Sequence, residues 1–217
     1  MVNFARFVAV SGALPEAVED NAYLAERFPE WSAEKIGSKT GIDRRHVAGE
    51  NEYVSDLATR AAQALLHEHQ IDPARIDHLL VCTQSPDFYM PITASLVHAS
   101  LGLRSGCGAN DFNLGCSGFI FGLGLAKGLI ESDQAEAVLL VTADTYSKYL
   151  NPEDKSVRTI FGDAATATLV TGGGSPESLH AFVYGTDGSG ARALIVPRGG
   201  LQTGDQLPDG SGTMPGA

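Results

Sequence analysis

The sequence predicts an α/β fold in which helices cover both faces of a β-sheet. Strand-like and helix-like segments alternate along most of the chain. The strand-like segments 76–84 and 135–143 are almost continuously apolar, which is typical of strands buried on both faces. A sheet that lies between helical layers explains both observations.

The individual elements follow from apolar periodicity and from capping signals. The strands are expected at 4–11, 76–84, 109–114, 135–143 and 165–172, and the helices at 56–69, 92–101 and 117–130. Ser55 is the expected N-cap of the first helix, and the second helix follows Pro91 and ends at Gly102. The third helix is apolar on all sides, so we expect it to be buried.

The chain changes character after residue 172. The segment TGGGSPES (171–178) is typical of a boundary or linker. Segments 179–185 and 193–197 are expected to pair as a hairpin around the turn between them. From residue 199 onward the chain is rich in Gly, Pro, Asp and Ser, which predicts a flexible segment.

Composition excludes several classes of function. The 217 residues carry a net charge of −11, which argues against nucleic-acid binding and against attraction to anionic lipid. Neither a membrane-spanning segment nor a convincing signal peptide is expected, so we expect a cytoplasmic protein. Cys82, Cys107 and Cys116 do not form a disulfide framework, and no metal-ligand spacing is present.

The central chemical feature is the segment NLGCSGFIFGLGLAKGLI (113–130), in which a strand turns sharply into a helix at Cys116. A thiol at a helix N-terminus lies near unpaired N–H groups and the positive end of the helix dipole, which lower its pKa. Small neighbouring residues leave room for an acyl chain. These features favour a nucleophile that forms a thioester. The competing interpretation is a small, inert core cysteine, as we expect for Cys82 and Cys107.

Several segments together resemble the β-ketoacyl-ACP synthase III family of thiolase-fold condensing enzymes. They are KTGIDRRHVA (39–48), SDLATRAAQALL (55–66), the stretch 76–103, the cysteine segment DFNLGCSGFIFGLGLAKGLI (111–130) and the stretch 139–170, which ends in FGDAATATLV. They occur in the family's order and spacing over residues 1 to about 197.

The resemblance implies a thiolase-like αβαβα layered fold and a two-step reaction. A primer acyl group would move from acyl-CoA to Cys116, and the acyl-enzyme would then condense with malonyl-ACP, with loss of carbon dioxide. The backbone N–H of Cys116 would be one oxyanion donor. Acyl-CoA and acyl carrier protein are therefore expected partners, and no cofactor or metal is expected. Asp163 in the FGD motif is expected to be structural.

Two further catalytic residues of the family, a His and an Asn from its second half, have no match. The chain resembles an N-terminal half (1–172), the start of a C-terminal half (173–198) and a flexible segment (199–217). We expect a truncated or cleaved chain, or a separate chain that completes the site, because a buried face would otherwise be exposed. A non-catalytic fragment is the third alternative.

The resemblance also suggests binding residues. Lys35 aligns with a Trp that stacks on the adenine of coenzyme A in many members, and Trp31 lies four residues earlier. Lys155 aligns with an Arg that contacts the nucleotide, and Arg158 lies nearby.

Two more positions are suggested by their place in the family. Arg44 lies near a coenzyme A contact, although Arg44, Arg45 and His46 also fit a solvated face. Met90 lies in a loop that, in the family, reaches across the dimer and forms the bottom of the partner's acyl pocket. The alternative is that Met90 packs as an ordinary interface residue. Dimerisation is expected through the strand 109–114.

Two other functions remain open at this stage. The first is a thiolase-fold acyltransferase that makes esters or amides without decarboxylation. The second is a structural subunit of a heteromeric synthase, in which Cys116 is not used.

Overall fold

The computed structural model describes residues 3–191 and 193–196 of the chain. The chain divides into two compact units, which interleave in sequence. Unit 1 comprises residues 1–15, 49–144 and 164–182, and unit 2 comprises residues 16–48, 145–163 and 183–217. The sequence also predicts a boundary at residues 171–178 between the two halves of the family fold. That boundary stays a prediction.

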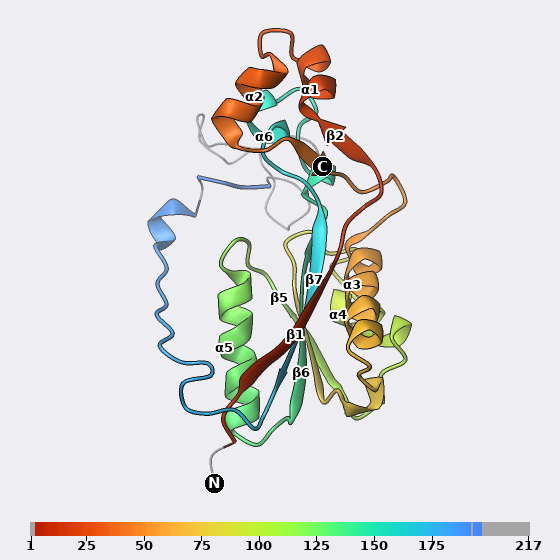
Figure 1. Ribbon diagram of the computed structural model, residues 1–217, viewed down its shortest axis with the longest axis vertical. Coiled ribbons are helices and arrows are strands. Elements are labelled where there is room, and N and C mark those ends of the chain that lie inside the picture. Colours follow the sequence, from red (N-terminus) through yellow and green to blue (C-terminus); the bar gives the residue numbers. More distant parts are fainter. Residues whose placement is uncertain (1–2, 192, 197–217) are drawn as a thin grey trace. The chain divides into compact units, whose positions relative to one another are not determined.

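Unit 1 is built on a five-stranded sheet with the strand order β1-β7-β6-β4-β5 (Figure 1). The strands are β1 (Arg6–Ala13), β4 (His78–Cys82), β5 (Gly108–Phe112), β6 (Ala137–Asp144) and β7 (Ala164–Thr171). Strand β4 is parallel to both of its neighbours, β5 and β6, while β7 is antiparallel to β6 and β1. All five predicted strands are therefore present, with their ends shifted by one or two residues.

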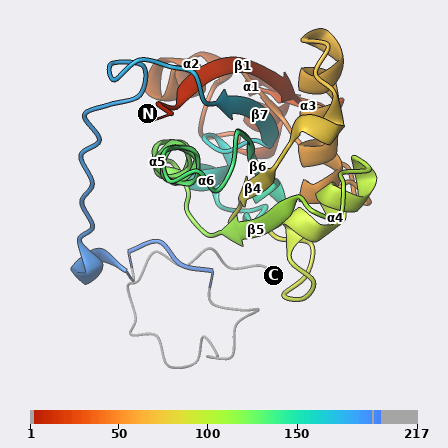
Figure 2. The ribbon, with the colours of Figure 1, turned by 90° about the horizontal axis from the view of Figure 1, so that it is seen from below.

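Helices cover both faces of this sheet, as the sequence predicts. Helices α3 (Val54–Glu68) and α4 (Thr93–Ser100) lie on one face, and α5 (Gly118–Glu131) lies on the other (Figure 2). Along β4, Leu79 and Val81 belong to the apolar cluster under α3, and Leu80 belongs to the cluster under α5. This alternation is the two-residue period of a strand that is buried on both faces.

Two details of the helices differ from expectation. Tyr53, not Ser55, is the N-cap of α3, and the Ser55 backbone N–H donates to Asp87 Oδ1 at 3.0 Å instead. Helix α5 was expected to be buried all round, but Ile120 and Leu125 are 48% and 47% exposed in this chain. Within the described residues, α5 is covered on its sheet-facing side only. The predicted end of α4 is confirmed, because Gly102 adopts a positive φ of 62°.

Unit 2 consists of short elements that sequence periodicity did not predict. Strands β2 (Val18–Asp20) and β3 (Arg44–His46) form an antiparallel pair, accompanied by helices α1 (Asn21–Arg27), α2 (Ala33–Thr40) and α6 (Lys155–Arg158). Leu24, Phe28 and Ile36 form its small apolar core, on which Trp31 packs. The caps are local: Ser32 Oγ accepts from the N–H of Lys35, and Gly41 ends α2 at a φ of 69°.

The predicted hairpin is wrong over its first segment. Residues 179–185 form no strand, and Leu179 and Phe182 pack instead against the apolar cluster under α5. Three single-turn 3-10 helices complete the secondary structure, at Pro73–Arg75, Tyr146–Lys148 and Gly188–Gly190. Pro197 and the expected flexible segment 199–217 lie outside the described residues. None of the helices described has both the length and the apolar character needed to cross a membrane.

Candidate functional site

Cys116 lies in the short turn that connects the carboxyl end of β5 with the start of α5. The turn is closed by a hydrogen bond of 2.8 Å from the Gly118 N–H to the Gly115 carbonyl. Ser117 is the N-cap of α5, so Cys116 lies one residue before the cap, close to the helix start that the sequence predicts. Its side chain is exposed in this chain. A thiol in this place is accessible to a reactant and lies beside the N–H groups of a helix start.

Glycines let the first turns of α5 lie directly on the sheet. A Cβ added at Gly118 would overlap Cys82 Sγ, and one added at Gly122 would lie 2.5 Å from Leu140 Cδ1. Larger residues at these two positions would push the start of α5 off the sheet, together with Cys116, two residues before Gly118. Close packing therefore explains Gly118 and Gly122 of α5.

The segment that leads into the turn is fixed by residues at the carboxyl end of β4. The Cys82 thiol donates to the Leu114 carbonyl at 3.1 Å, and Gln84 Nε2 donates to Asn113 Oδ1 at 3.1 Å. Burial raises the pKa of Cys82 to about 11, so its thiol remains protonated at neutral pH. Burial also raises the pKa of Cys107. Both cysteines are buried, which agrees with the expectation that they are unreactive.

A carboxylate at the end of β6 holds the loop that follows β4. Asp144 Oδ1 accepts hydrogen bonds from the Gln84 N–H at 2.7 Å, from Ser85 Oγ at 3.0 Å and from Thr83 Oγ1 at 3.1 Å. The pKa of Asp144 is raised overall, because burial raises it by more than these hydrogen bonds lower it. Sequence reasoning missed this residue. Its only signal was a carboxylate at the end of an apolar strand.

Met90 lies in an exposed loop of unit 1. Phe88, Tyr89 and Met90 are 57%, 73% and 87% exposed. The loop leads into α4, whose first N–H groups are bound by a residue of β5: Asp111 accepts from the Thr93 N–H at 2.6 Å and from the Ala94 N–H at 2.7 Å. The loop therefore ends at a point that is tied to β5, the strand that carries the turn of Cys116.

In unit 2, Lys35 and Lys155 come together on the ring of Trp31. Their ammonium nitrogens lie 5.4 Å and 5.5 Å from the ring centroid, and that of Lys39 lies 4.9 Å from it. Lys155 also forms an ion pair of 2.6 Å with Glu30. Sequence reasoning left Trp31 in doubt and missed Lys39. The signal was the spacing of Lys35 and Lys39, four residues apart, which places both on one side of α2. We call Trp31, Lys35, Lys39 and Lys155 the tryptophan–lysine cluster.

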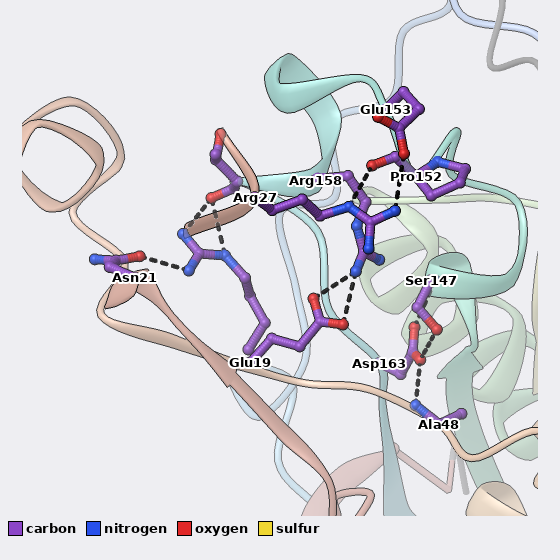
Figure 3. Close-up of polar contacts among 11 residues, drawn as sticks. Glu19, Asn21, Arg27, Ala48, Ser147, Pro152, Glu153, Arg158 and Asp163 are labelled. Carbon is purple, nitrogen blue, oxygen red and sulfur yellow. Dashed lines mark hydrogen bonds and ion pairs between the residues drawn. The ribbon is translucent and has the colours of Figure 1, made fainter. Parts of the chain in front are cut away.

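The arginines of unit 2 divide into exposed and internally paired side chains. Arg44 is exposed, as expected of a solvated face. Arg45 does not belong to that face: it is 3% exposed and donates to Asn21 Oδ1 at 2.7 Å and to the Thr159 carbonyl. Arg158 is 9% exposed, and its Nη2 lies 2.6 Å and 2.5 Å from the two carboxylate oxygens of Glu19 (Figure 3). The expected role of Arg158 in binding a ligand is contradicted by this buried pairing.

Asp163 has the structural role that the sequence predicts. It is 2% exposed, and its carboxylate accepts from the Ala48 N–H at 2.6 Å and from the Ser147 N–H at 2.8 Å (Figure 3). It thereby joins the chain after β3 to the chain after β6. The preceding Gly162 lies close to the His46 carbonyl, where a Cβ would be only 3.0 Å from the oxygen.

A cavity of about 640 Å³ in unit 1 does not belong to the cysteine site. It is lined by residues at the amino ends of the parallel strands, among them Arg6, Asp77 and Glu136. Cys116 follows the carboxyl end of β5, at the opposite edge of the same sheet. Across the described part of the chain, no cluster of three or more His, Cys, Asp or Glu side chains could hold a metal ion.

Comparison with known proteins gives consistent results. The family model described as 3-oxoacyl-[acyl-carrier-protein (ACP)] synthase III matches residues 110–188. The chain is 41% identical over 193 residues to β-ketoacyl-[acyl-carrier-protein] synthase III 3 of Streptomyces coelicolor, which covers 88% of this chain and 57% of that protein. It is 40% identical over 188 residues to β-ketoacyl-[acyl-carrier-protein] synthase III 2 of Staphylococcus epidermidis, with coverages of 87% and 57%.

Solved structures agree with the fold. The crystal structure of a 3-oxoacyl-(acyl-carrier-protein) synthase III is similar with a TM-score of 0.90 and 47% identity, over 92% of this chain and 60% of that chain. The corresponding protein of Pseudomonas aeruginosa has a TM-score of 0.85 and 38% identity, over 91% of this chain and 62% of that chain. The chain thus spans about three fifths of the length of these relatives.

Proposed function

Because the chain belongs to the β-ketoacyl-[acyl-carrier-protein] synthase III family, we propose that Cys116 accepts a primer acyl group as a thioester for condensation with malonyl-ACP. The observation that carries this proposal is the exposed thiol in the turn between β5 and α5. A thiol that is accessible at a helix start fits a nucleophile better than it fits a core residue. The proposed activity is that of an acyltransferase.

The first step is a thioester exchange. The Cys116 sulfur attacks the carbonyl carbon of acyl-CoA, the bond from that carbon to the coenzyme A sulfur breaks, and coenzyme A leaves with the proton that Cys116 gives up. The negative charge that develops on the carbonyl oxygen is stabilised by the backbone N–H of Cys116. In the second step malonyl-ACP loses carbon dioxide, its carbanion attacks the acyl carbon, and the Cys116 thiolate is expelled.

The tryptophan–lysine cluster supports coenzyme A as the acyl carrier. An indole ring with three ammonium groups around it offers a stacking surface for a base and positive charge for phosphates. Lys35 and Lys155 are the proposed contacts, with Trp31 and Lys39 added to them, and the exposed Arg44 is a further cation of the same unit. Arg158 is left out because its ion pair with Glu19 is largely buried, whereas the ion pair of Lys155 with Glu30 is exposed to solvent.

Two protein partners are proposed. The first is the carrier protein of malonyl-ACP, and the second is another copy of this chain. The edge position of β5 and the exposed loop with Phe88, Tyr89 and Met90 support a homodimer. The proposed condensation step also needs a His and an Asn, which the resemblance places in the second half of the family fold. A cytoplasmic location remains a prediction.

Intact-protein mass spectrometry tests the acyl-enzyme directly. The purified chain is incubated with a panel of acyl-CoA thioesters, and we expect one acyl adduct that maps to Cys116 and that hydroxylamine removes. Cys116→Ala should show no adduct, and Cys107→Ala should behave like the unchanged chain, because Cys107 is buried. An adduct that persists in Cys116→Ala would contradict the proposal. An adduct from acyl-ACP but not from any acyl-CoA would contradict only the proposed donor.

A further inference from the structure

Cys82 is a buried thiol that the proposed reaction does not use, yet it contacts the turn of the nucleophile on both sides. Its thiol donates to the carbonyl of Leu114, two residues before Cys116. The same sulfur lies against Gly118, two residues after Cys116, so closely that a Cβ there would overlap it. One sulfur atom therefore lies under the turn at both of its ends.

The position of Cys82 itself is fixed by the sheet. It is the last residue of β4, and it pairs in register with Phe112 of β5 and with Thr142 of β6. Its side chain is buried, with 3% of the residue exposed. A residue that is paired with strands on both sides cannot move without distorting the sheet. The hydrogen bond to Leu114 thus ties the turn to an interior strand of the sheet of unit 1.

The protonation state of Cys82 suits this contact. A thiol can donate one weak hydrogen bond, whereas a thiolate can donate none. Burial raises the pKa of Cys82 to about 11, and the bond to Leu114 is formed by the protonated side chain. At neutral pH the donor is therefore always present. An alanine at this position would fill less of the space under the turn and would leave the Leu114 carbonyl without this donor.

We propose that Cys82 is a positioning residue, which fixes the turn of residues 114–118 on β4 and thereby sets the reactivity of the Cys116 thiol. Its effect on turnover rests on the proposed function. Its effect on thiol reactivity does not, because alkylation of Cys116 needs no acyl donor. The two proposals can therefore fail independently.

The test compares the alkylation rate of Cys116 with iodoacetamide in Cys82→Ala, Cys82→Ser and the unchanged chain, with the modified residue identified by peptide mapping. We expect Cys82→Ala to slow alkylation about fivefold, as the loss of one hydrogen bond would do. Cys82→Ser retains a donor and should recover most of the rate. The pH midpoint of the alkylation rate should move in Cys82→Ala and return toward its original value in Cys82→Ser.

Cys107→Ala is the matched control, since it removes another buried thiol that lies at the other end of the same sheet. Cys107→Ala should lower the thermal stability about as much as Cys82→Ala does. It should leave the alkylation rate of Cys116 and the pH midpoint of that rate unchanged. The proposal is overturned if Cys82→Ala alkylates at the original rate with the original midpoint. It is also overturned if Cys107→Ala changes both as strongly as Cys82→Ala. If Cys82→Ala does not fold, Cys82→Val decides: it fills the space under the turn but has no donor for the Leu114 carbonyl, so it should slow alkylation as Cys82→Ala would, and the original rate would overturn the proposal.

Discussion

At the scale of single residues, the side chains around the turn of Cys116 have different tasks. Cys116 is exposed, whereas Cys82, Gln84 and Asp144 are engaged with the backbone or with each other. Burial raises the pKa of both Cys82 and Asp144, and Asp144 is the carboxylate among these supporting residues. Its ionisation is therefore coupled to the stability of the loop after β4.

Asp144→Asn should change how stability depends on pH. Because the pKa of Asp144 is raised above its ordinary 3.8 in the folded state, its contribution is fully present below pH 3.8 and is lost as pH rises through the folded pKa. The neutral amide of Asn cannot lose this contribution, and its oxygen can still accept hydrogen bonds. We therefore expect the free energy of unfolding of Asp144→Asn, relative to that of the unchanged chain, to increase as pH rises from 3.8 through the folded pKa of Asp144. Above that pKa the difference should level off. Urea unfolding at a series of pH values measures it, and a difference that is constant with pH would contradict the prediction.

At the scale of elements, α5 is defined by its contact with the sheet. Gly122 lies against Leu140 of β6 and Phe112 of β5, and the apolar residues Leu123, Ala126 and Ile130 complete the buried side. The opposite side, with Ile120 and Leu125, has no cover from the described residues. Helix α5 thus has one side that packs on the sheet and one apolar side that is exposed in this chain.

Gly122→Ala should destabilise the chain because the new methyl group meets Leu140 at 2.5 Å. We expect a loss of about 1–3 kcal/mol in the free energy of unfolding, as in other overpacked cores. Gly128→Ala is the matched control in the same helix: nothing lies within 4 Å of its added Cβ. This control should be stabilising by about 1 kcal/mol, because Ala favours the helix. Equal effects of the two substitutions in urea unfolding would show that close packing does not explain the glycine.

At the scale of the whole molecule, the exposed surface of unit 1 bears on association with another chain. Strand β5 is at the edge of the sheet, and Phe88, Tyr89 and Met90 expose a continuous apolar stretch in the loop before α4. Edge strands and exposed apolar surface are both typical of protein interfaces. They belong to the same unit as Cys116.

Tyr89→Glu combined with Met90→Glu should convert the proposed homodimer to monomers, because the new charges would have to be buried at the interface. Sedimentation velocity over a range of protein concentrations measures the change. Val183→Glu is the control, since Val183 is equally exposed, at 90%, but lies outside unit 1. A dimer that survives the double substitution would place the interface elsewhere.

The sequence predicted what depends on local patterns. Apolar runs located all five strands of unit 1, the strand–turn–helix pattern located Cys116, and Gly102 marked the end of α4. Periodicity failed in unit 2, because β2 and β3 have three residues each and α6 has four, too few for a period to emerge. It also failed for the hairpin, where Leu179 and Phe182 pack on the core under α5 and leave no paired strand.

The sequence by itself determined the fold class and the nucleophile candidate and predicted the family, because each rests on patterns within short segments of the chain. Only the tertiary structure decided that Arg158 pairs with Glu19, that three lysines surround Trp31, and that Cys82 lies under both ends of the turn of Cys116. Arg158 and Glu19 are 139 positions apart, and Cys82 and Leu114 are 32 apart. Contacts at such separations are set by how strands and helices pack, and a reading of local periodicity has no access to them.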